Sequence, residues 1–458
     1  MRYRKALLRT AVKHDLRVEF SEPGLTSFAG LELLIRYLRS IHLNELIGHQ
    51  FRGVVVPGDY SLVGMVRLLL GLVIVGGRRL RHVEFLRGDG LFERFCALRC
   101  LPSERTISRW LKHFSLQSVE RLQALNALLV ARLIHRQPFR TLTVDVDGSV
   151  VSTGLRVERA FRGFNPHHRK VPSYYPITAY LAETGQILRV KNRSGNVHDG
   201  KASITFLHDL FAQIQETVGS TYRLTFRMDG AFFHPKVLHL LKAKGAGFSI
   251  KVPFWKWLDL TRLIKERRRW QSISREIGCF DVEMPFEVWN QTLRVVIYRK
   301  KVFHRSRKNY QLDLFDPDDG YYEYSAIATN LSLRPRQLWN FMAGRGEHEK
   351  VIGQLKGHLA FNTIPTNHYG ANSAWQQLVA IAHNLLVSFQ IDTGAPRRHQ
   401  SEKHTCLYEL KTAQSLRFEL FNRAGRIARP HGVTVLRLSS NHRYRDLFTR
   451  TAQALKAA

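Results

Sequence analysis

The stretch Thr143-Val-Asp-Val-Asp-Gly-Ser149 alternates polar and apolar side chains. Side chains of a β-strand point in turn to its two faces, so Asp145 and Asp147 share one face and Val144 and Val146 take the other. Two acids on one face of a strand inside a sheet are costly unless water or a metal ion solvates them. The stretch therefore predicts either a metal-binding strand in the middle of a sheet or an edge strand that faces water.

Further strands and helices follow in an α/β order. The hydrophobic periodicity predicts strands at 141–151, 175–182, 186–193, 222–229 and 248–252, with helices at about 200–218 and 235–244. Three strands joined by short turns are thus followed by helix, strand, helix and strand. This order resembles that of a ribonuclease-H-like α/β core.

Charge is the strongest compositional signal. The 458 residues hold 70 Lys and Arg against 37 Asp and Glu, which gives a net charge of +33. A chain this basic is attracted to a polyanion, and DNA or RNA is the first candidate. The four cysteines show no disulfide or zinc spacing, and neither a membrane span nor a signal peptide stands out. We expect a cytoplasmic, nucleoid-associated protein with no membrane partner.

A second acid stands at the end of a later predicted strand. Within Tyr222–Asp229, the residues Arg227 and Asp229 share one face. Asp229 is the last residue of this strand, and open α/β sheets bind their ligands at the carboxyl ends of strands. Gly230 then permits a sharp exit from the strand.

A third acid lies on a predicted helix, in Arg345-Gly-Glu-His-Glu-Lys-Val-Ile-Gly-Gln-Leu-Lys356. Glu349 comes four residues after Arg345 and Lys356 comes eleven after it, so the three side chains share one stripe of the helix. Glu347 points the other way. We expect Glu349 to be a metal ligand and the two cations to face phosphate. Ordinary charge pairing along the helix is the alternative.

Asp147, Asp229 and Glu349 together suit phosphodiester chemistry with two metal ions. This chemistry needs carboxylates from separate elements that hold the ions ~4 Å apart. Magnesium prefers oxygen ligands, so two Mg²⁺ or Mn²⁺ ions are the expected cofactors. Asp145 stays open as an alternative first ligand.

Several basic segments are candidates for DNA binding. Pro102–His113 predicts a capped basic helix, which is either the second helix of a helix-turn-helix or an ordinary surface helix. Basic and aromatic residues interleave over 156–170, as in a DNA channel or in a surface loop with its rings tucked inward. Trp270 is either a base-stacking residue or part of the core. The candidate residues are Arg105, Arg109, Lys112, Arg156, Arg159, Arg162, Arg169, Lys170, Arg267, Arg268, Arg269, Trp270, Lys300 and Lys301.

These motifs in this order resemble the DDE transposases of bacterial insertion sequences. The matching residues are Asp147-Gly-Ser149, Arg227-Met-Asp-Gly-Ala-Phe232 and Arg345-Gly-x-x-Glu349 with Lys356, together with Leu25–Gly30, Ser194–His198, Ala371-Asn372 and His383–Leu385. The branch that they resemble is the transposase DDE domain group 1, which is related to the piggyBac transposases. The resemblance covers nearly the whole chain.

The resemblance implies a transposase that binds the terminal inverted repeats of its own element. It would cut the strands at each end with a metal-activated water and join the free 3′ ends to target DNA, with Asp147, Asp229 and Glu349 holding the metals. At least a homodimer on DNA is expected, because two ends must be held together. Two other interpretations stay open: a non-catalytic DNA-binding relative that acts as a repressor, and a metal-dependent nuclease without strand transfer.

The chain is expected to divide into five regions. A helical region for DNA-end binding or dimerisation comes first, and a catalytic core interrupted by a β-rich insertion follows. The expected bounds are 1–136 for the helical region, 137–252 for the first part of the core, 253–333 for the insertion, 334–395 for the second part of the core with the Glu349 helix, and 396–458 for a basic C-terminal tail.

Overall fold

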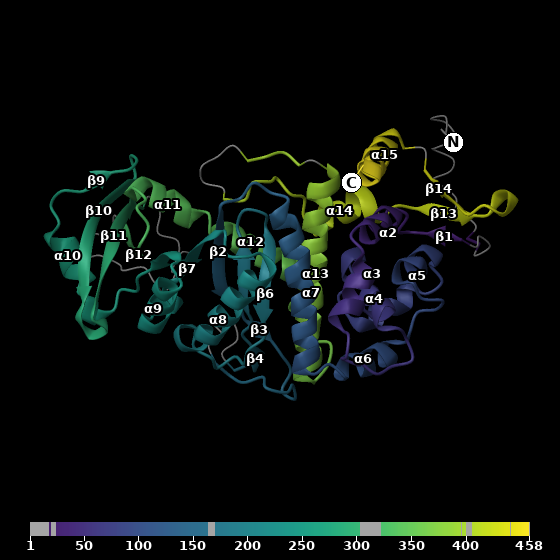
Figure 1. Ribbon diagram of the computed structural model, residues 1–458, viewed down its shortest axis with the longest axis horizontal. Helices are drawn as coiled ribbons and strands as arrows, with labels where there is room; N and C mark the ends of the chain where they lie inside the picture. The colour runs from purple at the N-terminus through teal and green to yellow at the C-terminus, as the bar shows by residue number, and fades with distance from the viewer. Residues whose placement is uncertain are drawn as a thin grey trace.

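The computed structural model describes residues 18–19, 24–163, 170–302, 322–394, 396–399, 405–439 and 441–457. In these residues a nine-stranded mixed sheet is flanked by helices, and a helical body adjoins it on one side (Figure 1). The mixed α/β class that the sequence predicts is confirmed.

The strand that carries Asp145 and Asp147 lies inside the large sheet. It is β2, which runs antiparallel to β5 and parallel to β7, in the order β6-β5-β2-β7-β8. The edge-strand alternative is therefore wrong. The bounds are Thr141–Gly148 for β2, Ile177–Leu181 for β5, Gln186–Lys191 for β6, Arg223–Met228 for β7 and Gly247–Lys251 for β8.

The β-rich segment extends this same sheet. Its strand β12 pairs antiparallel with β8, with Thr329 opposite Ser249, and β11, β10 and β9 follow outward. The bounds are Gln271–Ser272 for β9, Ile277–Phe286 for β10, Gln291–Lys301 for β11 and Tyr322–Thr329 for β12. The sheet therefore continues without a break from the acid-bearing strands into the insertion.

Helices cover the sheet and follow its strands. The helix α8 packs against α9, and α7 packs against β6 and the long helix α13. The strands bury Val144, Phe226 and Phe248 in the core beneath these helices. The bounds are Leu116–His135 for α7, Asp199–Thr217 for α8, Pro235–Ala243 for α9, Leu260–Glu266 for α10, Pro335–Ala343 for α11, Gly346–His358 for α12 and Tyr369–Gly394 for α13.

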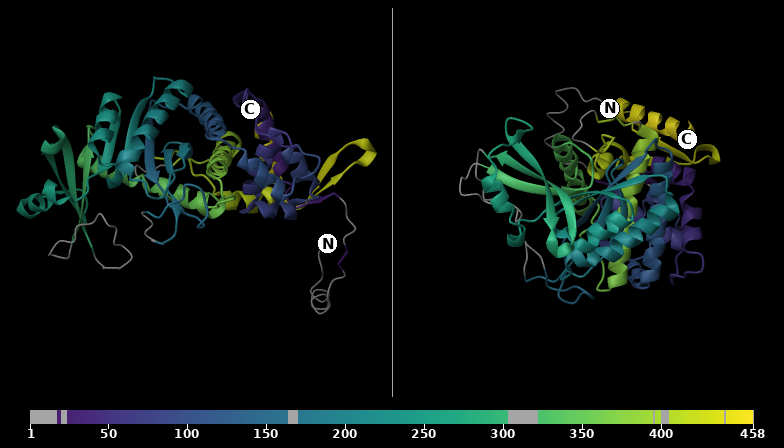
Figure 2. Two further views of the ribbon diagram at one scale, coloured as in Figure 1. Left: turned by 90° about the horizontal axis from the view of Figure 1, so that it is seen from below. Right: turned by 60° about the vertical axis from the view of Figure 1, so that its left-hand side comes forward.

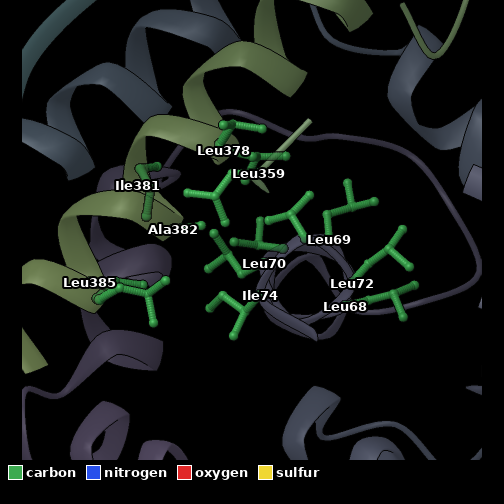
Figure 3. Packing of buried hydrophobic residues seen from close by; sticks show 14 of the residues in the cluster. Leu68, Leu69, Leu70, Leu72, Ile74, Leu359, Leu378, Ile381, Ala382 and Leu385 are labelled. Carbon is green, nitrogen blue, oxygen red and sulfur yellow. The ribbon is translucent and has the colours of Figure 1, made fainter. Parts of the chain in front are cut away.

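The helical body is built around α4, which is buried over almost its whole length. Its leucines point outward on several sides and meet α13 and Leu359 (Figure 3). None of the helices in the described part of the chain is long and apolar enough to cross a membrane. The bounds are Leu31–Ser40 for α2, Leu43–Gln50 for α3, Leu62–Val75 for α4, Gly90–Cys96 for α5 and Glu104–Lys112 for α6.

The C-terminal segment packs back onto the N-terminal helices. Its helix α15 contacts α2 and α13, and its strands β13 and β14 form a three-stranded sheet with β1. The sequence predicts neither this sheet nor α15. The bounds are Leu25–Thr26 for β1, Val151–Ser152 for β3, Ser173–Tyr174 for β4, Ala413–Leu416 for α14, Gly425–Ala428 for β13, Val435–Leu438 for β14 and His442–Ala457 for α15.

Candidate active site

Three acids from separate elements converge on one guanidinium group. Asp147 lies near the end of β2, Asp229 directly follows β7, and Glu349 is in the first turn of α12. The Nη2 atom of Arg345 lies 2.9 Å from Asp147 Oδ2 and 3.7 Å from Asp229 Oδ2, and its Nη1 atom lies 3.3 Å from Glu349 Oε1. The predicted set is thus brought together around a cation of the chain itself.

The charges of this cluster do not balance. The pKa of Asp147 is raised to about 7, mainly by burial; Arg345 opposes this shift, and Asp229 and Glu349 add to it. Burial alone would lower the pKa of Arg345, but the carboxylates around it outweigh burial and the pKa is raised. Three carboxylates therefore share a single guanidinium, and the site has a place for further positive charge.

Arg345 and Lys356 face inward. The Arg345 side chain is only 8% exposed and lies among the carboxylates. Lys356 donates from Nζ to the carbonyl oxygen of Val150 at 2.9 Å, in the loop that follows β2. Burial lowers the pKa of Lys356, and Asp147 counteracts this. Arg345 thus contacts the three carboxylates and Lys356 contacts a backbone carbonyl. The sequence predicts that both cations face phosphate.

Asp145 has a different environment from Asp147. Its two carboxylate oxygens accept from Nε and Nη2 of Arg227 at 2.5 Å and 2.7 Å, and both side chains are 0% exposed. Arg227 Nη1 also donates to the carbonyl oxygen of Phe341 and to Thr405 Oγ1. Asp145 is therefore already paired in the interior, which favours Asp147 as the first ligand.

The helix α12 separates its two glutamates as predicted from its spacing. Glu349 lies on the Arg345 side, whereas Glu347 pairs with Lys350 at 2.7 Å. Between them His348 is buried, with its ring stacked on Tyr180. The stripe on which Glu349 lies is thus the one that faces β2 and β7.

A fourth acid near the site was missed. Asp199, the first residue of α8, is buried; it accepts from Tyr175 Oη at 2.8 Å and pairs with Arg193 at 2.5 Å. It lies near enough to Asp147 to raise the pKa of that carboxyl. Its sequence signal is weak, because an acid in the first turn of a helix is ordinary.

The donor set suits magnesium, since all three predicted ligands offer carboxylate oxygens. Asp147 and Asp229 contact the same nitrogen of Arg345, so a cation placed there could meet both. As the side chains are arranged, no group of three His, Cys, Asp or Glu side chains in the described ranges is close enough to hold an ion. Arg345 lies between the acids, and binding would require its guanidinium to shift.

The predicted DNA-binding residues fall in three separate places (Figure 1). The first group lies on α6 in the helical body, the second in the loop between β3 and β4, and the third beside β9 and at the end of β11. The exposed members are Arg105, Arg109, Lys112, Arg156, Arg159, Arg162, Lys170, Arg267, Arg268, Arg269, Lys300 and Lys301. Arg169 lies outside the described residues.

Trp270 is covered on more than one side. Its ring centroid lies 4.9 Å from that of Phe280, and the Arg299 guanidinium lies over the ring at 4.5 Å. Its side chain is only partly exposed. The more exposed indoles of the insertion are Trp255 and Trp257, which stack on each other at 5.7 Å. These contacts favour the core alternative for Trp270.

One family of known proteins matches nearly the whole chain. Among curated proteins there is no match. Among solved structures, the chain resembles a piggyBac transposase in a synaptic complex with hairpin DNA, at 12% identity and a TM-score of 0.39 over 87% of this chain and 82% of that chain. The model of the transposase DDE domain group 1 matches residues 8–458, and the protein therefore belongs to this family of transposases.

Proposed function

We propose that the protein binds the terminal inverted repeats of its insertion sequence and carries out cut-and-paste transposition by metal-dependent strand cleavage and strand transfer. The observation that carries this proposal is the convergence of Asp147, Asp229 and Glu349 around Arg345. The repressor alternative has no need of such a cluster, in which three acids are held by one cation.

The five strands β6-β5-β2-β7-β8 would form a ribonuclease-H-like core. Their directions support this, because β5 is antiparallel to β2 and to β6, whereas β7 and β8 run parallel to β2. In chain order this is three antiparallel strands followed by two parallel ones. The two acids on strands lie at the carboxyl ends of the central pair, where α/β sheets bind ligands.

Asp147, Asp229 and Glu349 would hold two Mg²⁺ or Mn²⁺ ions, which when bound supply activation of the attacking oxygen and stabilisation of the leaving one. Before the ions bind, Arg345 keeps the three carboxylates turned toward one point and partly neutralises them. Lys356 braces the Val150 carbonyl and thereby the backbone just after Asp147. Orientation of charged groups before the reaction is a large part of such catalysis.

DNA would be the partner in both steps, as terminal inverted repeat and as target. The net charge of +33 supports this, because duplex DNA binds basic chains through counterion release. At least a homodimer is expected on DNA, since two ends are joined in one reaction.

The test uses the full chain, Mg²⁺ and a duplex that carries the element end with its flanking DNA. Asp147→Asn and Asp229→Asn should each slow cleavage at least about a hundredfold, roughly 2.7 kcal/mol in barrier height. Binding of the duplex should be retained. Asp259→Asn, which changes an exposed acid of the insertion, is the matched control.

Sequencing of the products separates the alternatives. Cut ends joined to new DNA support transposition, and cut ends that are never joined support the nuclease alternative. Unchanged cleavage in both Asn variants would refute the proposed site. A wild-type chain that binds the ends but never cuts them would favour the repressor.

A further inference from the structure

The segment that contains β13 and β14 has an unusual charge pattern. Residues 420–445 include six arginines and no Asp, Glu or Lys. The two strands form a hairpin that projects from the helical body, at the opposite end of the molecule from the insertion (Figures 1 and 2). The candidate DNA-binding residues from the sequence include none of these arginines.

The two faces of this hairpin differ. Ile427, Leu436 and Leu438 lie on the inner face and pack against the helical core. On the outer face Arg426 lies directly opposite Arg437, and both are exposed. The tip adds Arg429 and the exposed residues 431–435, of which Val433 is 64% exposed. Positive charge is thus concentrated on the face that does not pack on the protein.

The hairpin is hydrogen-bonded to the N-terminal segment that precedes α2. Backbone hydrogen bonds run from Ala29 N to Arg423 O at 2.8 Å and from Ile427 N to Gly24 O at 2.8 Å. Gly30 fits because a side chain there would overlap the backbone of Leu420. The hairpin is therefore a fixed projection whose orientation is set by the helical body.

We propose that this basic hairpin binds duplex DNA, with its outer arginines on phosphates and its tip in the major groove. The assignment rests on the proposed function, because it names the surface that holds the element end while the carboxylates cut. The major groove of B-DNA is about 12 Å wide and admits a two-stranded β-ribbon. The major groove of A-form RNA is too narrow, so duplex DNA is the partner.

The charge complementarity can be tested by the salt dependence of binding. In Arg426→Ala/Arg437→Ala, which removes the two arginines of the outer face, the slope of log affinity against log salt should fall in magnitude by roughly 2, because each lost phosphate contact removes about 0.9. Affinity for the element-end duplex should fall about tenfold at moderate salt. Arg52→Ala/Arg99→Ala removes two exposed arginines of the helical body and should change neither value appreciably.

A second variant tests the tip. Val433→Glu places a negative charge at a 64% exposed position and should weaken binding of duplex DNA more than Val433→Ala does. Circular dichroism and thermal melting verify that each variant is folded. On an RNA duplex of the same sequence the variants and the wild type should differ little.

Three results would overturn the assignment of the hairpin: unchanged affinity and slope in the arginine double variant, an equal loss in the control pair, or equal losses on RNA. The proposed function fails separately. If the hairpin variants bind normally while Asp147→Asn still abolishes cleavage, the hairpin is wrong and the catalytic proposal stands. If the wild type binds no DNA duplex, both fail.

Discussion

Two arginine–carboxylate clusters meet on β2, and they differ in their balance and exposure. Asp145 and Arg227 form a one-to-one pair with both side chains 0% exposed. Two residues further on, Asp147 belongs to a cluster in which Arg345 faces three carboxylates, and Glu349 there is 60% exposed. Arginine and carboxylate thus form a fully buried pair at Asp145 and a partly exposed cluster at Asp147.

This difference separates a structural role for Asp145 from a ligand-binding role for Asp147. A balanced buried pair satisfies all its charges and leaves nothing for a ligand to bind. An excess of acid beside solvent is unfavourable in the isolated protein and becomes favourable when a cation binds. Neighbouring acids on one strand therefore have different roles because of their partners, and four experiments can test this distinction.

The largest expected effect is on stability. Asp145→Asn leaves the Arg227 guanidinium buried without its counter-charge, and losing one partner of a buried pair costs about 3–5 kcal/mol. Urea denaturation should show this loss, while the matched change Asp147→Asn should not destabilise the fold. If both variants lose the same stability, the two clusters are not distinct in the way described.

The next effect is on activity and compares the two glutamates of α12. Glu349→Gln should slow strand cleavage about a hundredfold, roughly 2.7 kcal/mol, because it removes an acid of the open cluster. Glu347→Gln, two residues away but paired with Lys350, should cut at close to the wild-type rate. Single-turnover cleavage assays measure both. A larger loss of rate in Glu347→Gln than in Glu349→Gln would mean that the Glu347 face of α12 lies at the site.

A smaller effect is expected on the pH dependence of melting. Burial raises the pKa of Asp147 to about 7, so the folded protein holds a proton that the unfolded chain has released above its ordinary pKa. The stability that this proton contributes is complete below the unfolded pKa and is lost as the pH rises through about 7. Without divalent ions, Asp147→Asn should therefore melt a few degrees above the wild type at pH 8 and close to it at pH 5.

Calorimetry at several pH values, with ionic strength held constant, provides the measurement. A difference that grows toward pH 5, or wild-type melting that is flat across this range, would contradict the assigned pKa shift. Asp259→Asn, an exposed change that keeps Asp147 in place, serves as the comparison.

The smallest expected effect concerns competition between Arg345 and a metal ion. Arg345→Gln leaves Asp147, Asp229 and Glu349 without their guanidinium, so Mg²⁺ should raise the melting temperature more in this variant than in the wild type. A difference on the order of 1 kcal/mol is expected from ligand linkage. Sodium chloride at equal ionic strength is the control. Equal shifts would mean that Arg345 and the ion do not share the carboxylates.

The pattern of the sequence predicts much of the sheet and the acids on it. Alternation over 143–149 predicts the shared face of Asp145 and Asp147, and β2 shows it. Helical spacing separates Glu349 from Glu347, as the structure bears out. Strand alternation and helical spacing both repeat every few residues, so local backbone geometry alone determines which side chains share a face.

Features that depend on partners far along the chain could not be predicted. Arg227 pairs with Asp145 across 82 residues, and only the register of β2 and β7 brings them together. The strands of the basic hairpin have only four residues each, too few for their alternation to stand out within the sequence of a basic tail. Trp270 next to three arginines suggests a surface residue, whereas Phe280 and Arg299 enclose it.

The continuity of the sheet at β8 has a consequence for truncation. β12 supplies the hydrogen-bonding partners of one side of β8, so the insertion protects an edge. A chain that lacks residues 253–333 would expose that strand to pairing with other chains, which is a route to aggregation. Shortening the outermost strands carries less risk of aggregation, because β9 already forms the edge of the sheet there. Residues 253–333 therefore also cover the edge of β8, the strand that pairs with β7.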